Sequence, residues 1–134
     1  MEPTSKRTAP SMDAWLQEAK AHPDAGKVGM YLTHNGTVRA TPRSKVRQGA
    51  EDAAEVTGML FSYDEARVSA AVEEARRMEG IYYVRVWLNS GHLQVGDDIM
   101  YVLIGGDIRP RVIDAMQFLV GQLKTTCVSE TELT

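Results

Sequence analysis

Gly105-Gly106-Asp107-Ile108-Arg109-Pro110-Arg111 is the stretch that decides the fold, because an apolar run enters it and a helical pattern leaves it. The run from Ile99 to Ile104 is continuously apolar, which predicts a strand buried on both faces. Pro110 suits the first turn of a helix, and apolar residues at helical spacing continue from there to Lys124. The two glycines predict a turn and a close approach of the backbone to another group.

The same stretch has the outline of an anion site. A helix start leaves unpaired N–H groups and a positive dipole end, and Arg109 and Arg111 add two charges there. An ordinary tight turn with two solvated arginines fits these residues as well. Lys124 follows Arg109 by fifteen residues, which is about 22 Å along one helix. The two cations can therefore meet on one ligand only if the helix breaks or a second copy of the chain supplies one end.

Composition limits the class of protein. A chain of 134 residues with 43% hydrophobic and 25% charged residues fits one globular domain. The net charge of −3 argues against broad nucleic-acid binding, and no apolar run approaches the roughly 18 residues of a membrane helix. Cys127 is the single cysteine, so no intrachain disulfide can form. With no secretory signal in residues 1–10, we expect a cytoplasmic protein.

Patterning predicts a disordered polar tail over residues 1–10 and one domain over residues 11–134. The predicted helices are Met12–Lys20, Glu65–Met78 and Pro110–Lys124, and the predicted strands are Lys27–His34, Val56–Tyr63, Ile81–Leu88 and Ile99–Ile104. Asn35-Gly36 predicts a turn, and no clear element follows Lys124. This order predicts an α+β domain in which two helices cover one side of a mixed or antiparallel sheet.

The segment from Ala40 to Glu55 has no apolar periodicity and predicts a mobile loop. Its basic residues Arg43, Lys45 and Arg47 could close over an anion, although a solvated loop is the better interpretation.

Standard signatures of catalytic chemistry are absent from the sequence. His22, His34 and His92 lack metal-ligand spacing, so we predict neither a metal nor a cofactor. The segment from Gly91 to Gly96 has the glycine spacing of a phosphate loop but not its lysine. What remains is three cations at special backbone positions, namely Arg39, Arg109 and Lys124.

The order of these three cations along the chain, together with the motifs around them, resembles that of the MoaE family. Members of this family are the large catalytic subunits of molybdopterin synthase. The resemblance runs from about Val28 to Thr125. The motifs that carry it are Asn35-Gly36-Thr37-Val38-Arg39, Leu60 and Tyr63 leading into Glu74-Ala75-Arg76, Gly91-His-Leu-Gln-Val-Gly96-Asp97, and Arg109 followed by Asp114-Ala115-Met116-Gln117-Phe118 and Leu123-Lys124-Thr125.

The resemblance implies an α/β hammerhead fold, a homodimer, and a MoaD-like, ubiquitin-like small subunit whose Gly-Gly tail ends in a thiocarboxylate. It implies that sulfur from two such tails passes to cyclic pyranopterin monophosphate and makes molybdopterin. Lys124 matches a catalytic position, where it would act as a cation or acid/base. Arg39 and Arg109 match substrate-binding positions, where an arginine is suited to bind the phosphate of the substrate.

The chain departs from the family pattern at three places. Ile108 stands where the family has a histidine, Thr131 stands at the place of a second active-site lysine, and a further C-terminal segment of the family has no counterpart before Thr134. Two interpretations stay open: a synthase subunit in which Lys124 suffices, or a non-catalytic MoaE-like dimeric protein with a binding or regulatory role. The retained cations favour the first, and no role is predicted for Cys127.

Overall fold

The computed structural model describes residues 5–42 and 54–134 of the chain. In chain order, its elements are α1 (Met12–Lys20), a 3-10 turn (Ala25–Lys27), β1 (Met30–Thr37), β2 (Gly58–Tyr63), α3 (Glu65–Arg76), β3 (Ile81–Leu88), β4 (Gly91–Gln94), β5 (Asp98–Gly106), α4 (Arg109–Gln122), a π turn (Leu123–Cys127) and β6 (Val128–Leu133). The predicted α+β class is confirmed. In the described ranges the strands form two three-stranded antiparallel sheets, of order β1-β5-β3 and β4-β2-β6.

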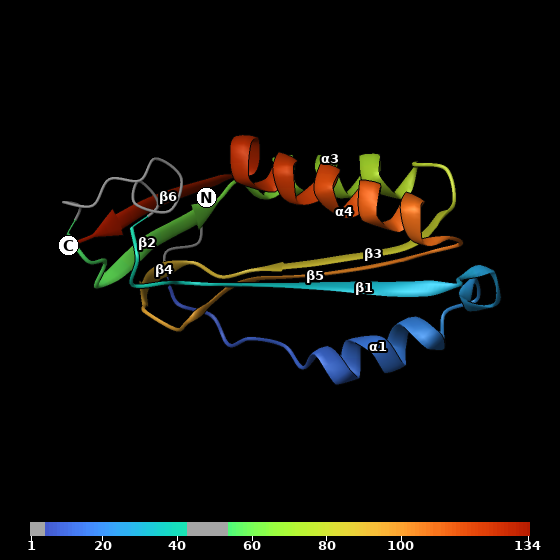
Figure 1. Cartoon of the computed structure of the whole chain (residues 1–134), viewed down its shortest axis with the longest axis horizontal. Helices are drawn as coiled ribbons and strands as arrows, with labels where there is room; N and C mark the ends of the chain where they lie inside the picture. The colour runs from blue at the N-terminus through green and yellow to red at the C-terminus, as the bar shows by residue number, and fades with distance from the viewer. Residues whose placement is uncertain (1–4, 43–53) are drawn as a thin grey trace.

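β5 is the centre of the fold, as its apolar sequence predicts. It lies between β1 and β3, with α3 and α4 on one face of this sheet and α1 on the other (Figure 1). Val102 and Ile104 belong to the main core, whereas Leu103 packs in a smaller cluster with Trp15 of α1. All three β5 side chains are fully buried. Because successive side chains of a strand point to opposite faces, β5 needs apolar residues at every position.

Gly105 and Gly106 continue β5 instead of forming the predicted turn, and they pair with β1. The predicted close approach is confirmed. A Cβ on Gly106 would lie 2.6 Å from Val112 Cγ2 and 2.8 Å from the Gly80 carbonyl oxygen. A Cβ on Gly105 would lie 2.7 Å from Tyr31 Cε1 of β1, so Gly105 is required by packing against β1 and Gly106 by packing against α4. The chain bends only at Asp107 and Ile108.

The turn predicted at Asn35-Gly36 is wrong, because both residues lie within β1. They pair with Tyr101 and Met100 of β5, and the register shifts only after Gly36. A hairpin turn of the Asn-Gly type needs positive φ angles, whereas Gly36 is not among the positive-φ residues. The Asn35 amide instead donates to the Met100 carbonyl oxygen at 3.2 Å. β1 accordingly begins later and ends later than predicted.

The strand β6 was not predicted, since its sequence is polar and acidic. Its backbone pairs with β2 along its whole length, from Val128 opposite Tyr63 to Leu133 opposite Gly58. Strand pairing uses backbone groups, so a strand with one solvated face can carry polar side chains. The helix predicted up to Lys124 ends at Gln122, and the π turn that follows leads into β6.

Residues 5–11 form a segment without a helix or strand that contacts the end of β3 and the two residues after it. Arg7 is its main anchor: its guanidinium donates to the Tyr63 hydroxyl at 2.8 Å and to the Leu88 carbonyl oxygen at 2.6 Å. It also lies 5.6 Å from the ring centre of Trp87. Disorder of residues 1–10 stays a prediction, and residues 1–4 lie outside the described residues.

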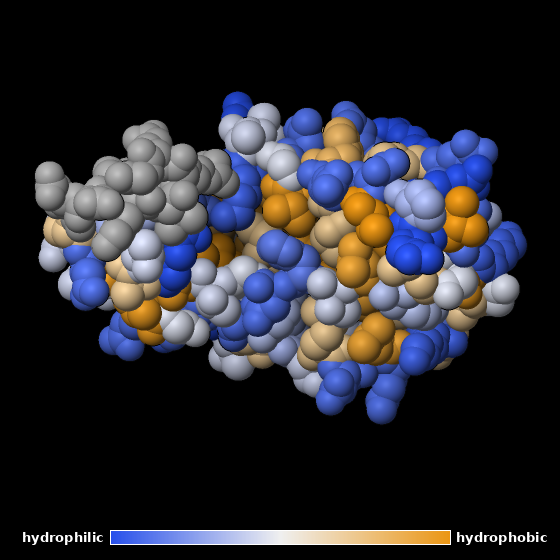
Figure 2. Space-filling view, in the orientation of Figure 1, coloured by the Kyte–Doolittle hydropathy of each residue, from blue (hydrophilic) through white to orange (hydrophobic). Residues whose placement is uncertain are grey.

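The face seen in Figure 2 carries hydrophobic side chains interspersed among hydrophilic ones. No helix in the described part of the chain combines the length and the apolar character needed to span a bilayer.

Candidate functional site

A cavity of about 370 Å³ lies where the β1-β5-β3 sheet meets the β4-β2-β6 sheet and the π turn. Its lining comes from β1 and the residues that follow it, from β2, from β5, and from Lys124 and β6. The lining residues are His34, Gly36, Thr37, Arg39, Met59, Ile99, Met100, Lys124, Glu130 and Glu132. The structure thus brings Arg39 and Lys124, two of the three predicted site cations, to one cavity.

Lys124 is placed by the π turn. The hydroxyl groups of Thr125 and Thr126 donate to the carbonyl oxygens of Gly121 and Gln122, each at 2.8 Å, and hold the chain where α4 ends. The Lys124 ammonium then lies 3.5 Å from Glu130 Oε1 of β6. If the helix continued beyond Gln122, the chain could not turn back to pair with β2 as β6. The end of the helix therefore places Lys124 and β6 at the cavity.

Arg39 follows the register shift at the end of β1. Its neighbour Val38 is buried and donates its N–H to the Asp97 carbonyl oxygen at 3.0 Å, which fixes the backbone. The Arg39 side chain is exposed, and its Nε donates to the Thr41 carbonyl oxygen at 3.1 Å. The guanidinium therefore sits on an anchored backbone at the cavity while its other N–H groups can serve a ligand.

His34 lies beside Lys124 on the β1 side of the cavity. Burial, and then the charge of Lys124, lower the pKa of the imidazole below its usual value of 6.5. His34 is therefore neutral at pH 7. Its Nε2 atom is buried and has no hydrogen-bond partner, and the same holds for Glu130 Oε1.

Sequence reasoning missed His34, Glu130 and Glu132 as lining residues. Glu130 and Glu132 share one face of β6, and this alternation was the available signal, but it has meaning only once β6 is recognised as a strand. The two carboxylates balance the charges of Arg39 and Lys124. The cavity is therefore of mixed charge and not a simple cationic pocket.

Arg109, the third predicted cation, does not line this cavity. It is exposed at the first residue of α4, at the other end of that helix from Lys124. The anion site outlined there is already used by the chain itself: Asp107 accepts the Ile108 N–H at 2.7 Å and pairs with Arg111 at 2.7 Å. Arg111 also lies 3.3 Å from Glu79. The loop residues Arg43, Lys45 and Arg47 lie outside the described residues.

Thr131, which the resemblance sets at the place of a second lysine, points away from Lys124. It lines a separate hollow on the second sheet, together with Leu60 and His92. Since side chains alternate along β6, Glu130 and Glu132 face the Lys124 cavity and Thr131 does not.

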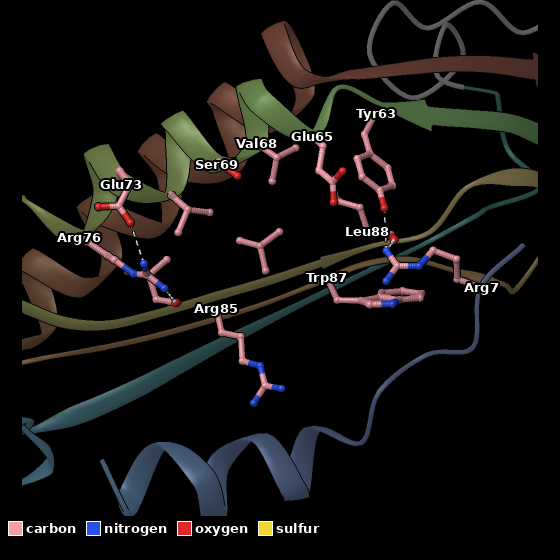
Figure 3. Close-up of a pocket in the computed structure, with 13 residues that line it drawn as sticks. Arg7, Tyr63, Glu65, Val68, Ser69, Glu73, Arg76, Arg85, Trp87 and Leu88 are labelled. Atoms are coloured by element: carbon pink, nitrogen blue, oxygen red, sulfur yellow. Dashed lines mark hydrogen bonds and ion pairs between the residues drawn. The ribbon is translucent and has the colours of Figure 1, made fainter. Parts of the chain in front are cut away.

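A second cavity, of about 410 Å³, lies between α3 and β3 (Figure 3). Its cations are engaged: Arg76 pairs with Glu73 at 2.7 Å, and Arg7 is held by Tyr63 and Leu88. The slightly larger volume does not make it the better candidate, because the two buried polar side-chain atoms that lack a hydrogen-bond partner in the described ranges belong to residues of the Lys124 cavity. In residues 5–42 and 54–134, no group of three or more His, Cys, Asp or Glu could hold a metal ion.

Solved structures with this architecture are found among molybdopterin biosynthesis proteins. A Burkholderia ambifaria molybdopterin biosynthesis MoaE protein superposes with a TM-score of 0.71 at 22% identity, over 95% of this chain and 79% of that one. Molybdopterin synthase from Staphylococcus aureus gives 0.64 at 13% identity, over 80% and 75%. A complex of subunits 1 and 2 of molybdopterin-converting factor from Helicobacter pylori gives 0.65 at 16% identity, over 91% and 75%. The fold is therefore that of MoaE-type α+β proteins.

Residues 7–126 match the family described as MoaE protein. The chain belongs to the MoaE family, a family of molybdenum cofactor biosynthesis, and the predicted resemblance is confirmed. Comparison with curated proteins gave no significant match.

Proposed function

We propose that this chain is the large subunit of a molybdopterin synthase. In this role it transfers sulfur from a thiocarboxylated, ubiquitin-like small subunit to cyclic pyranopterin monophosphate. The observation that carries the proposal is the cavity lined by both Arg39 and Lys124 in a chain of the MoaE family. Its volume of about 370 Å³ is in the range of small-molecule sites.

Each cation has a distinct task in this proposal. The thiocarboxylate sulfur first bonds to a carbon of the substrate and displaces an oxygen substituent there. A water molecule then adds to the terminal carbonyl carbon of the small subunit, negative charge gathers on the carbonyl oxygen, and the carbon–sulfur bond breaks, which leaves sulfur on the substrate and a carboxylate on the small subunit. The Lys124 ammonium stabilises that charge or donates a proton to it. The Arg39 guanidinium binds the phosphate of the substrate, for which its planar set of donors is suited.

The proposed assembly is a homodimer with one small subunit on each protomer. A Gly-Gly tail has no side chains and can thread a narrow entrance toward Lys124. Arg109 stands about 22 Å from Lys124 along the helix and its continuation, so it can act on the same substrate only from a second copy of the chain. A two-fold contact between α4 ends would supply it, and two-fold dimers are the commonest assembly.

A non-catalytic binding protein is the second candidate. The observation that favours it is the Lys124–Glu130 pair, because a carboxylate 3.5 Å away competes with any anion for the ammonium. The missing lysine at Thr131 and the missing histidine at Ile108 point the same way.

A conversion assay separates the two candidates. Purified chain, thiocarboxylated small subunit and cyclic pyranopterin monophosphate are mixed, and the dithiolene product is measured. We expect product with the thiocarboxylated tail, and neither product nor tight binding with a small subunit lacking its last two glycines. Binding of the intact tail without product would favour the non-catalytic candidate, and equal binding of the truncated tail would contradict both.

A further inference from the structure

Two buried polar atoms without a hydrogen-bond partner belong to residues that line the same cavity. In the described ranges, His34 Nε2 and Glu130 Oε1 are the only buried side-chain nitrogen or oxygen atoms of this kind. They come from different sheets, β1 and β6, and both residues line the Lys124 cavity. Buried polar groups are nearly always hydrogen-bonded, and leaving one unpaired costs stability. Their coincidence at one place indicates a ligand that supplies the missing partners.

Lys124 does not remove this need. Its ammonium is 3.5 Å from Glu130 Oε1, which is close enough for attraction between charges, but the oxygen is left without a hydrogen bond. An ionised carboxylate has two oxygens and only accepts hydrogen bonds. Glu130 therefore remains able to accept from donors of a ligand while it attracts Lys124.

We propose that Glu130, with His34 beside it, recognises the N–H donors of a heterocyclic ring, while Arg39 and Lys124 face the anionic part of the same ligand. This inference rests on the proposed function and names the part of the substrate that each side chain binds. The pyrimidine ring of a pterin carries an amide N–H next to an amino group, and this pair of parallel donors matches the two oxygens of a carboxylate. Glu130 and His34 are thus specificity-determining residues for a pterin.

The mixed charge of the cavity follows from this assignment. A site for phosphate alone would gain nothing from Glu130, because a carboxylate beside Lys124 repels an anion. A site for a molecule that has N–H donors at one end and a phosphate at the other needs both signs of charge. The lowered pKa of His34 fits the same assignment, since a neutral imidazole can hydrogen-bond the ring without adding a third cation.

The test uses two probes on the full chain, each of which carries half of the ligand. The first is 6-hydroxymethylpterin, which has the donor edge and no phosphate, and the second is inorganic phosphate. Binding of each is measured by calorimetry for the wild type, Glu130→Gln, His34→Leu and the control Asp114→Asn. Asp114 is exposed on α4 and outside the cavity, so its variant removes one carboxylate elsewhere.

We expect Glu130→Gln to weaken pterin binding by about tenfold or more, because an amide offers one acceptor where the carboxylate offers two. The same variant should bind phosphate severalfold more tightly, because Lys124 loses its competing partner. His34→Leu should weaken pterin binding severalfold and leave phosphate unchanged. A misfolded variant would lose both ligands, so opposite changes for the two probes identify recognition and not damage.

Unchanged pterin affinity in Glu130→Gln, or a wild type that does not bind 6-hydroxymethylpterin, would overturn the inference. Loss of both ligands in Glu130→Gln, with an unchanged circular dichroism spectrum, would also overturn it. The conversion assay decides the proposed function separately: a wild-type chain that makes product but recognises no pterin edge through Glu130 keeps the function and refutes this assignment.

Discussion

The two ends of α4 both carry cations, yet the structure treats them differently. At its start, Asp107 accepts the Ile108 N–H and pairs with Arg111, so the chain supplies its own anion there. At its end, Lys124 follows the helix in a π turn and lines a cavity in which two buried polar atoms lack a hydrogen-bond partner. A sequence pattern of cations at helix ends therefore does not identify a site. Ion pairs do not separate the two ends, since Lys124 pairs with Glu130 as Arg111 pairs with Asp107; what separates them is that His34 Nε2 and Glu130 Oε1 lack hydrogen-bond partners near Lys124.

The largest expected effect is on catalysis at the end of α4. Lys124→Ala should lower the rate of conversion by about 10²–10³-fold, the range found when one group that stabilises developing charge is removed. The control Lys20→Ala removes an exposed lysine of α1 and should keep the wild-type rate. Single-turnover kinetics with the thiocarboxylated small subunit measure both. A Lys124→Ala chain as fast as the control would move the site elsewhere.

The second largest effect is expected on the free energy of unfolding, and one glycine near each end of α4 tests it. Gly106→Ala places a Cβ 2.6 Å from Val112 Cγ2 and 2.8 Å from a backbone oxygen, and should lower the free energy of unfolding by about 1–3 kcal/mol. Gly121→Ala meets nothing within 4 Å in the last turn of α4 and should raise it by about 0.5–1 kcal/mol. Urea denaturation tests both, and equal effects at the two positions would contradict this account of the packing.

The smallest expected effect is a pH dependence that arises at the cavity. The pKa of His34 is lowered in the folded chain, first by burial and then by Lys124, while in the unfolded chain it is near 6.5. Between these two values the unfolded state binds more protons, so the stabilisation present above pH 6.5 is lost as pH falls through the folded-state pKa. Arg39, Glu130 and Glu132 are the other charged groups that face this cavity.

Chemical denaturation at a series of pH values measures this effect. The variant His34→Gln should lack the loss of stability just below pH 6.5. The separate loss from Asp97, whose pKa is lowered chiefly by its hydrogen bond with Lys6, should occur only below about pH 3.8 and should persist in the variant. The same slope in the variant and the wild type near pH 6 would contradict the assigned environment of His34.

Much of the fold could be predicted because it depends on local pattern. The spacing of apolar residues gave α1, α3 and α4 to within a few residues, and the unbroken run in β5 gave a strand buried on both faces. β6 could not be predicted in this way, because its polar residues are stabilised by backbone pairing with β2 and not by burial. The Asn35-Gly36 pair predicts a turn that does not form, because pairing with β5 overrides the local preference for a turn.

The candidate site was predicted only in part, and for the same reason. Arg39 and Lys124 could be selected because they stand at the ends of predicted elements and match a family pattern. Glu130 and Glu132 belong to the unpredicted strand, so their approach to Lys124 could not be anticipated. His34 has no metal-ligand spacing in the sequence, and its surroundings are made by residues distant in sequence, such as Lys124.

The central claim is that the Lys124 end of α4 acts together with the Arg109 end of a second copy. Mixing Arg109→Ala chains with Lys124→Ala chains tests it most directly. In the proposed dimer, each mutant homodimer would have two damaged sites, whereas a mixed dimer would have one intact and one doubly damaged site. With full exchange of equal amounts, half the dimers are mixed, so the account predicts about a quarter of the wild-type conversion rate. If native mass spectrometry confirms the exchange and no activity returns, the shared site is wrong.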